Sequence, residues 1–134
     1  MKKRYTLTKQ CIALIIFLVL QYLLGMATNL FVQFPEKGND VAMWKFTWSR
    51  IPLALHIILG IGLLIGSVAL LLRSLRQKNK IWIKASLAGM ISILISGVAG
   101  SEFVSSQADI YSFIMAAGFI AAILSYGWGA YKSN

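Results

Sequence analysis

Residues 51–72 read IPLALHIILGIGLLIGSVALLL, and His56 is the only ionisable side chain in this run. An α-helix rises about 1.5 Å per residue, so the run would extend about 33 Å, slightly more than the hydrocarbon core of a bilayer. This length distinguishes it from a helix buried in a soluble core. A strand is excluded because open sheet edges cannot satisfy their backbone groups in lipid. The run therefore predicts a transmembrane helix.

Three further apolar runs of similar length lie at 11–32, 81–101 and 110–131. Hydrophobic residues make up 58% of the 134 residues and charged residues 13%, whereas a soluble domain averages about 25% charged. Short connections make consecutive helices antiparallel neighbours. The sequence therefore predicts one all-α integral membrane domain, residues 1–134, folded as an up-down bundle of four transmembrane helices. The longest connection is the predicted outer loop, residues 33–50.

Basic residues are concentrated on one side of the predicted spans. The segments that share a side with the N-terminus contain Lys2, Lys3, Arg4, Lys9, Arg73, Arg76, Lys78, Lys80, Lys84 and Lys132. The acidic residues all lie on the other side: Glu36, Asp40, Glu102 and Asp109. Because basic segments stay in the cytoplasm, we expect both termini there, the N-in and C-in orientation. The net charge of +9 then reflects topology and attraction to anionic lipid, not nucleic-acid binding.

The first apolar run allows a second interpretation. A basic start, an apolar stretch and the sequence Gly25-Met26-Ala27 are also typical of a cleaved signal peptide. The apolar run continues past these residues to Val32, however. We therefore expect a retained helix, since cleavage would leave three spans.

The predicted outer loop contains an aromatic alternation, Trp44, Phe46 and Trp48. In water this pattern would suggest a strand, but beside a bilayer it is typical of the aromatic belt at the headgroup level. A surface for a substrate or partner is the alternative. Gly38-Asn39-Asp40 supplies turn residues within the same loop.

Small side chains form narrow stripes on the predicted helices. Gly89, Ser92, Ser96 and Gly100 are spaced by three and four residues, and Gly60 shares a helix face with His56. Small residues let membrane helices approach closely and gain van der Waals contact. We expect these stripes to face the bundle interior, and a homodimer face is the alternative. The interior faces of the first and fourth helices would carry Gln21, Gly25, Thr28, Ser112, Met115, Phe119, Ala122 and Tyr126.

The main candidate site is a layer around His56, the only histidine in the chain. An ionisable side chain within a span is a functional candidate by default. Met26, Ser96 and Met115 lie at similar predicted depths, and imidazole with thioether suits haem iron or copper(I). Glu102, with Asp109, would form a polar mouth at the outer end. The alternative is structural: a neutral His56 held by a hydrogen bond, and methionines that fill gaps in the core.

Common enzyme signatures are missing from the sequence. There is one cysteine, Cys11, so no Cys-x-x-Cys motif and no intramolecular disulfide can form. A single histidine excludes a bis-histidine haem within one chain and a multi-histidine zinc site. Gly60-Ile61-Gly62 lies in the middle of a predicted helix, where packing explains it. We expect a protein that is not an enzyme.

Several segments resemble small uncharacterised four-span membrane proteins of Gram-positive bacteria. These segments are Asn29 with Phe31, residues 55–60, residues 100–104, residues 112–116 and Tyr126. The resemblance implies a location in the bacterial plasma membrane and attaches no activity. The His56-x-x-Leu59-Gly60 run is more distantly similar to the histidine-bearing helices of membrane b-type haem proteins, which usually supply a second histidine.

Three functions remain open from the sequence. The first is a binding or accessory protein whose outward-facing pocket around His56 takes a hydrophobic ligand, with b-type haem and quinone as the sharpest versions. The second is an interaction or immunity-type subunit that contacts a membrane protein partner through its helices. The third is a small transporter that works as a homo-oligomer.

Overall fold

The computed structural model describes residues 2–35 and 39–133, with side chains from residue 7 onward, and it contains five helices. Four of them are long and apolar enough to cross a membrane, which confirms the four spans expected from the sequence. The fifth is a short helix between the first two spans. The helices are α1 (Lys2–Phe31), α2 (Asp40–Ser49), α3 (Ile51–Arg76), α4 (Lys80–Ser106) and α5 (Asp109–Ser133).

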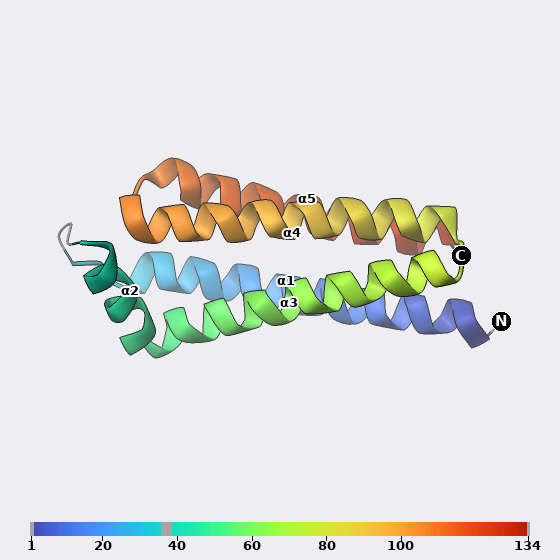
Figure 1. Cartoon of the computed structure of the whole chain (residues 1–134), viewed down its shortest axis with the longest axis horizontal. Helices are drawn as coiled ribbons and strands as arrows, with labels where there is room; N and C mark the ends of the chain where they lie inside the picture. Colours follow the sequence, from blue (N-terminus) through green and yellow to red (C-terminus); the bar gives the residue numbers. More distant parts are fainter. Residues whose placement is uncertain (1, 36–38, 134) are drawn as a thin grey trace.

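The four long helices run alternately up and down, so both termini lie at one end of the bundle and α2 lies at the other (Figure 1). Helix α1 packs against α3 and α5, and α4 packs against the same two helices. The bundle therefore has the cyclic order α1, α3, α4, α5. We call the end that carries the termini the basic end and the opposite end the α2 end.

A tight turn joins α3 and α4 at the basic end. Asn79 caps α4, because its side-chain oxygen accepts hydrogen bonds from the backbone N–H groups of Ile81 and Trp82 at 3.2 and 3.3 Å. Lys78 adopts a positive φ of 51°, and the Asn79 N–H donates to the carbonyl of Ser74 at 3.2 Å. This turn holds the two helices together at the basic end, whereas they diverge toward the α2 end (Figure 1).

The connection from residue 33 to residue 50, expected to be a loop, contains helix α2. Asn39 caps this helix by accepting a hydrogen bond from the Ala42 N–H at 2.9 Å, and Asp40 stands in the first turn. The aromatic alternation therefore lies on a helix and forms no strand. Met43 and Thr47, four residues apart, are the buried side chains of α2. The acidic and basic residues expected in this loop at Glu36 and Lys37 lie outside the described part of the chain.

All four spans extend beyond the apolar runs that predicted them, at one end or at both. Helix α3 continues past residue 72 to Arg76, so Arg73 and Arg76 occupy its last turn, where positive charge complements the helix dipole. Helix α4 continues past residue 101 to Ser106. The hydropathy pattern marks the part of each helix that suits lipid, and the helices project past it.

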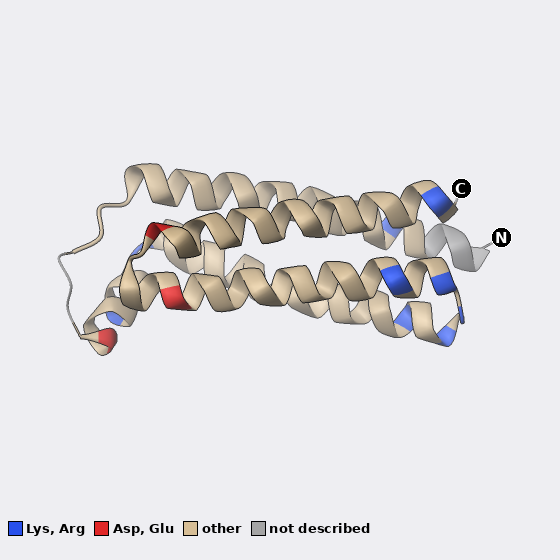
Figure 2. Ribbon diagram, turned by 90° about the horizontal axis from the view of Figure 1, so that it is seen from above, with Lys and Arg blue, Asp and Glu red and all other residues tan. Residues whose placement is uncertain are grey.

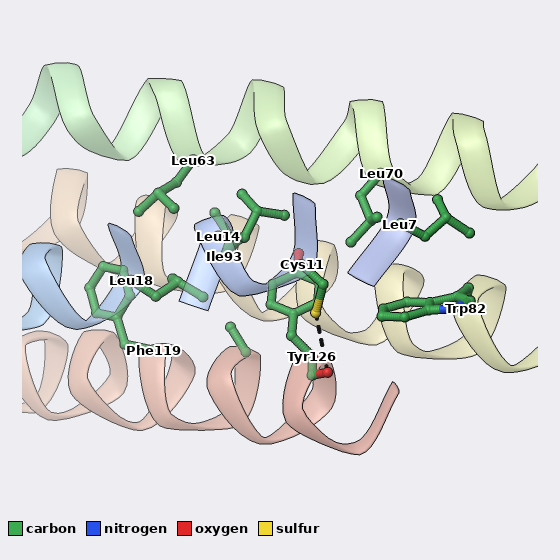
Figure 3. Close-up of a cluster of buried hydrophobic side chains, with 11 residues drawn as sticks. Leu7, Cys11, Leu14, Leu18, Leu63, Leu70, Trp82, Ile93, Phe119 and Tyr126 are labelled. Atoms are coloured by element: carbon green, nitrogen blue, oxygen red, sulfur yellow. Dashed lines mark hydrogen bonds between the residues drawn. The ribbon is translucent and has the colours of Figure 1, made fainter. Parts of the chain in front are cut away.

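A cluster of buried side chains that includes Cys11, Trp82 and Tyr126 fills the half of the bundle near the basic end, which we call the tightly packed half (Figure 3). Trp82 and Tyr126 are fully buried there, and the Cys11 thiol donates a hydrogen bond to the Tyr126 carbonyl at 3.3 Å. Gly89 lies against the Tyr126 ring, and Gly129 against Ala85 and Trp82, so a Cβ at either glycine would collide with its neighbours. Large side chains fill this half because the glycines admit them.

Charge is segregated along the bundle (Figure 2). Lysine and arginine residues gather at the basic end. Arg73 and Arg76 are in the last turn of α3, Lys132 is in the last turn of α5, Lys78 follows α3, and Lys9 lies near the start of α1. The acidic residues that the structure describes lie at the α2 end, on α2, α4 and α5, together with Lys45 and Arg50. The outward faces between the two ends are apolar, as contact with lipid requires.

Candidate functional site

A cavity of about 470 Å³ lies between the four spans in the half of the bundle near the α2 end. This volume is within the range of small-molecule binding sites, about 300–1,000 Å³. Its end wall is formed by Phe34, which precedes α2, and by Trp44 and Thr47 of α2. The side walls include Gln21, Gly25, Met26, His56, Gly60, Ile61, Leu94, Ser96, Gly97, Val98, Gly100, Ser112, Met115 and Phe119.

The α1–α3 wall is built from a reciprocal pair of contacts. Gly25 on α1 faces the imidazole of His56 on α3, and a Cβ added to Gly25 would lie 2.9 Å from His56 Cε1. One turn away, Gly60 on α3 faces Gln21 on α1, and a Cβ there would lie 3.3 Å from Gln21 Nε2. Each helix thus has a glycine opposite the polar side chain of the other helix. The space left by these glycines lets Gln21 and His56 lie between the two helices, where both line the cavity.

Two polar atoms at this wall are buried and have no hydrogen-bond partner in the described part of the chain: Gln21 Oε1 and His56 Nδ1. The Gln21 amide N–H donates to the backbone carbonyl of His56 at 2.8 Å, which fixes the amide and leaves its oxygen free. Gln21 is only 2% exposed, so water does not satisfy this oxygen from outside the bundle. The His56 ring packs edge-on against Phe119, with ring centroids 6.4 Å apart. Buried polar groups are normally hydrogen-bonded. Trp82 Nε1 and Tyr126 Oη, in the other half of the bundle, are also buried without a partner among the described residues. What distinguishes Gln21 and His56 is that both residues line the cavity, where a ligand or ordered water could reach them.

The α4–α5 wall is closely packed. The Ser96 hydroxyl lies within hydrogen-bond distance of the Ser92 carbonyl on its own helix, at 3.0 Å, and of the Met115 carbonyl on α5, at 3.2 Å. Gly118 on α5 leaves room for Ser96, because a Cβ there would collide with the serine hydroxyl and lie 3.0 Å from the Ser92 carbonyl oxygen. Gly100 similarly faces Met115, because a Cβ added to Gly100 would lie 3.1 Å from the Met115 sulfur.

Four of the residues in the predicted layer line this one cavity: Met26, His56, Ser96 and Met115. Met26 is nonetheless 46% exposed on the bundle surface, and Ser96 is engaged in the packing of α4 against α5. Glu102, predicted to form a mouth with them, is exposed and is not part of the cavity wall.

The predicted packing residues are divided between the two halves of the bundle. Gly60 and Gly100 line the cavity, whereas Gly89 lies against Tyr126 in the tightly packed half. Ser92 is half-buried and contributes its backbone carbonyl to the contact with Gly118.

Sequence reasoning placed Gln21 and Gly25 on an inward face but did not assign them to the site. A glutamine within an otherwise apolar span was the available signal, because a polar side chain in hydrocarbon needs a partner. Trp44 was considered only as part of an alternative substrate or partner surface in the loop, and Gly118 and Thr47 were not connected with the site. Nothing in the local sequence indicates that α2 folds over the end of the bundle.

The chemistry of the cavity is neutral. Among the described residues, none that lines it is Asp, Glu, Lys or Arg. The described residues also contain no group of three or more His, Cys, Asp and Glu side chains placed to hold a metal ion. The α1–α3 wall can therefore offer hydrogen bonds to a neutral group, from Gln21 and His56 and also from Thr28 and Asn29, which line the cavity.

Searches with the whole chain found no matching protein-family model, no matching curated protein and no matching solved structure. Function is therefore inferred from the geometry of the cavity and from the residues that line it.

Proposed function

We propose that this membrane protein binds a neutral hydrophobic molecule with a hydroxyl head group, held in the cavity by Gln21 and His56. The observation that carries the proposal is the pair of unpartnered polar atoms, Gln21 Oε1 and His56 Nδ1, at the wall of an apolar cavity. A carbonyl oxygen such as Gln21 Oε1 can only accept, so the ligand must donate to it. Neutral imidazole has one donor and one acceptor nitrogen, and a hydroxyl group can complement either.

A quinol fits this description better than haem. Its hydroxyl groups donate to an amide oxygen, and its ring and tail suit a cavity lined by Phe119, Leu94 and Val98. Haem carries two carboxylates, and burying a carboxylate without a cation is costly. The cavity wall, as far as the structure describes it, supplies no cation, which favours the neutral ligand.

The orientation that we propose places the α2 end outside the cell and the basic end in the cytoplasm. The support is the charge distribution, since the positive-inside rule follows Lys and Arg in short connections. In that orientation the cavity lies in the outer half of the membrane. The resemblance to four-span proteins of Gram-positive bacteria would place the protein in a bacterial plasma membrane.

The test is a titration of the detergent-purified protein with a benzoquinone that carries a ten-carbon tail, in its quinone and quinol forms. Quenching of tryptophan fluorescence reports binding, because Trp44 lines the cavity. We expect saturable binding of one quinol per chain. His56→Leu should weaken it about 10-fold, since a hydrogen bond in an apolar site contributes on the order of 1–2 kcal/mol. Gln21→Leu should weaken quinol binding more than quinone binding, because only the quinol donates to Gln21.

Ser74→Ala is the matched control. Ser74 is a fully buried polar residue on the same helix as His56, bonded to the Leu70 carbonyl and outside the cavity wall. It should bind as the wild type does. Quenching that does not saturate, or that is equal in all four proteins, would show simple partition into the micelle and refute the proposal. A Soret band that depends on His56 after addition of haem would instead assign the cavity to haem.

A further inference from the structure

Helix α2 covers the α2 end of the cavity, where Trp44 and Thr47 form part of its wall. Met43 is 2% exposed and Thr47 is fully buried, so α2 is packed down onto the bundle rather than held away from it. Gln107, after the end of α4, donates to the Pro35 carbonyl at 3.1 Å and contacts the Met43 sulfur at 3.7 Å. The Phe34 ring packs edge-on against Phe103 with centroids 5.5 Å apart. These contacts join the α2 segment to α4 across the end of the bundle.

Certain residues of α3 and α4 line the cavity and are also exposed on the bundle surface, and the same holds for Met26 on α1. Ile61 on α3 lines the cavity and is 53% exposed, and Leu94 and Val98 on α4 line it and are 42% and 63% exposed. Gly97 also lines it, and its missing Cβ would meet nothing within 4 Å. Ile61, Leu94, Gly97 and Val98 belong to α3 and α4, the two helices that diverge from their turn at the basic end (Figure 1).

The depth of these residues determines what they face. Ile61 is ten residues into α3, which begins at Ile51. That places it about 15 Å along a span that crosses about 30 Å of hydrocarbon, near the middle of the bilayer. Lipid tails, not water, therefore surround the bundle at this depth.

We infer that the ligand enters the cavity sideways from the bilayer, through the gap between α3 and α4 beside Ile61, Gly97 and Val98. This inference rests on the proposed function and specifies its ligand as a lipid-like molecule dissolved in the membrane. Its hydroxyl head reaches Gln21 and His56, and its aliphatic tail lies in the gap and extends toward the surrounding lipid. His56 is five residues from Ile61, about 7.5 Å along the helix. The first few carbons of the tail are therefore long enough to connect the hydroxyl head at His56 with the gap at Ile61.

The experiment uses the full chain in liposomes and a long-chain primary alcohol with a photoactivatable diazirine a few carbons from its hydroxyl group, where the tail passes through the gap. Cross-linked peptides are identified by mass spectrometry, with and without excess unlabelled alcohol. We expect competable labelling of residues 57–64 and 94–101. Gly97→Trp should fill the gap and reduce competable labelling at least fivefold.

Gly127→Trp is the matched control, since Gly127 also has nothing within 4 Å of its missing Cβ and is not part of the cavity wall. It should leave the labelling unchanged. Labelling that is competable but concentrated on residues 40–49, and unaffected by Gly97→Trp, would overturn the lateral route while leaving ligand binding intact. Absence of any competable labelling would overturn both the route and the proposed function. The labelled positions in the wild-type chain test the route even if Gly97→Trp fails to fold.

Discussion

Gly25 on α1 and His56 on α3 are in direct contact: a Cβ on the glycine would lie 2.9 Å from the imidazole carbon Cε1. The absent side chain is what lets the ring sit between the two helices. On its other side the ring faces Phe119 and the cavity. The glycine therefore sets the position of the only imidazole in the chain.

Gly25→Ala should displace the imidazole more than it destabilises the fold. The new methyl group needs space, and the His56 ring can move toward the cavity without disturbing any backbone. We expect the free energy of unfolding to change by less than about 1 kcal/mol and quinol affinity to fall about 10-fold, as for an off-rotamer side chain that loses its hydrogen bond. Unfolding and quinol titration in detergent measure the two quantities.

Gly62→Ala is the control for this substitution, because a Cβ at Gly62 meets nothing within 4 Å. It should change neither quantity. In the His56→Ala background, Gly25→Ala should have no further effect on binding. An undiminished affinity in the single variant would show that the contact does not position the ring for the ligand.

Gly118→Ala should behave in the opposite way, with a large loss of stability. Its Cβ would collide with the Ser96 hydroxyl and would stand 3.0 Å from the Ser92 backbone carbonyl, which cannot move without moving α4. Overpacking of this kind costs about 1–3 kcal/mol. Gly127→Ala on the same helix has open space and should be neutral. Equal thermal unfolding midpoints for the two variants in detergent would contradict the observed α4–α5 contact.

Gln107→Ala should loosen α2 from the bundle. The side chain of Gln107 donates to the Pro35 carbonyl and contacts the Met43 sulfur, and the substitution removes both interactions. A lost hydrogen bond of about 1 kcal/mol corresponds to roughly fivefold faster amide exchange if α2 opens independently of the spans. Hydrogen–deuterium exchange of residues 40–49 measures the effect, with Ser106→Ala as the neighbouring control. Unchanged exchange of α2 would show that other contacts hold it in place.

The N-in and C-in orientation predicts which single cysteines a membrane-impermeant maleimide can reach in intact cells. In a Cys11→Ala background, cysteines at Asp40 and Asp109 should be labelled from outside. Cysteines at Lys78 and Lys132 should be labelled only after the cells are broken. The reverse labelling pattern would show that the bundle has the opposite orientation in the membrane. Labelling of Lys132→Cys and Asp109→Cys from the same side would refute the span between them.

The four spans could be predicted from the sequence because length and hydropathy are properties of each segment alone. The inward faces were also accessible, since spacing by three and four residues places Ser96 and Gly100 on one side of a helix. Helix α2 was missed because its aromatic alternation was more conspicuous than the Asn39 cap that begins it.

The partners across the bundle could not be read from the sequence. That Gly25 admits His56, and Gly60 admits Gln21, depends on the register between α1 and α3, which no local pattern fixes. Met26, His56, Ser96 and Met115 lie at similar depths along their predicted spans, and all four line the cavity. Depth along a helix does not reveal that Met26 is half exposed, or that none of the described lining residues is Asp, Glu, Lys or Arg.

The unequal packing of the two halves also has a mechanical consequence. Helices α3 and α4 are clamped by the Asn79 turn beside fully buried Trp82 and Tyr126, and their other ends stand apart over the cavity. Because few contacts hold the two helices together away from this turn, we expect their relative motion to be smallest near residues 77–79 and largest at the α2 end. Helix α2 contacts both α3 and α4 at this end, and we expect these contacts to limit the motion. The basic end, where the helices are held together, and the α2 end, where they stand apart, therefore lie at opposite faces of the membrane.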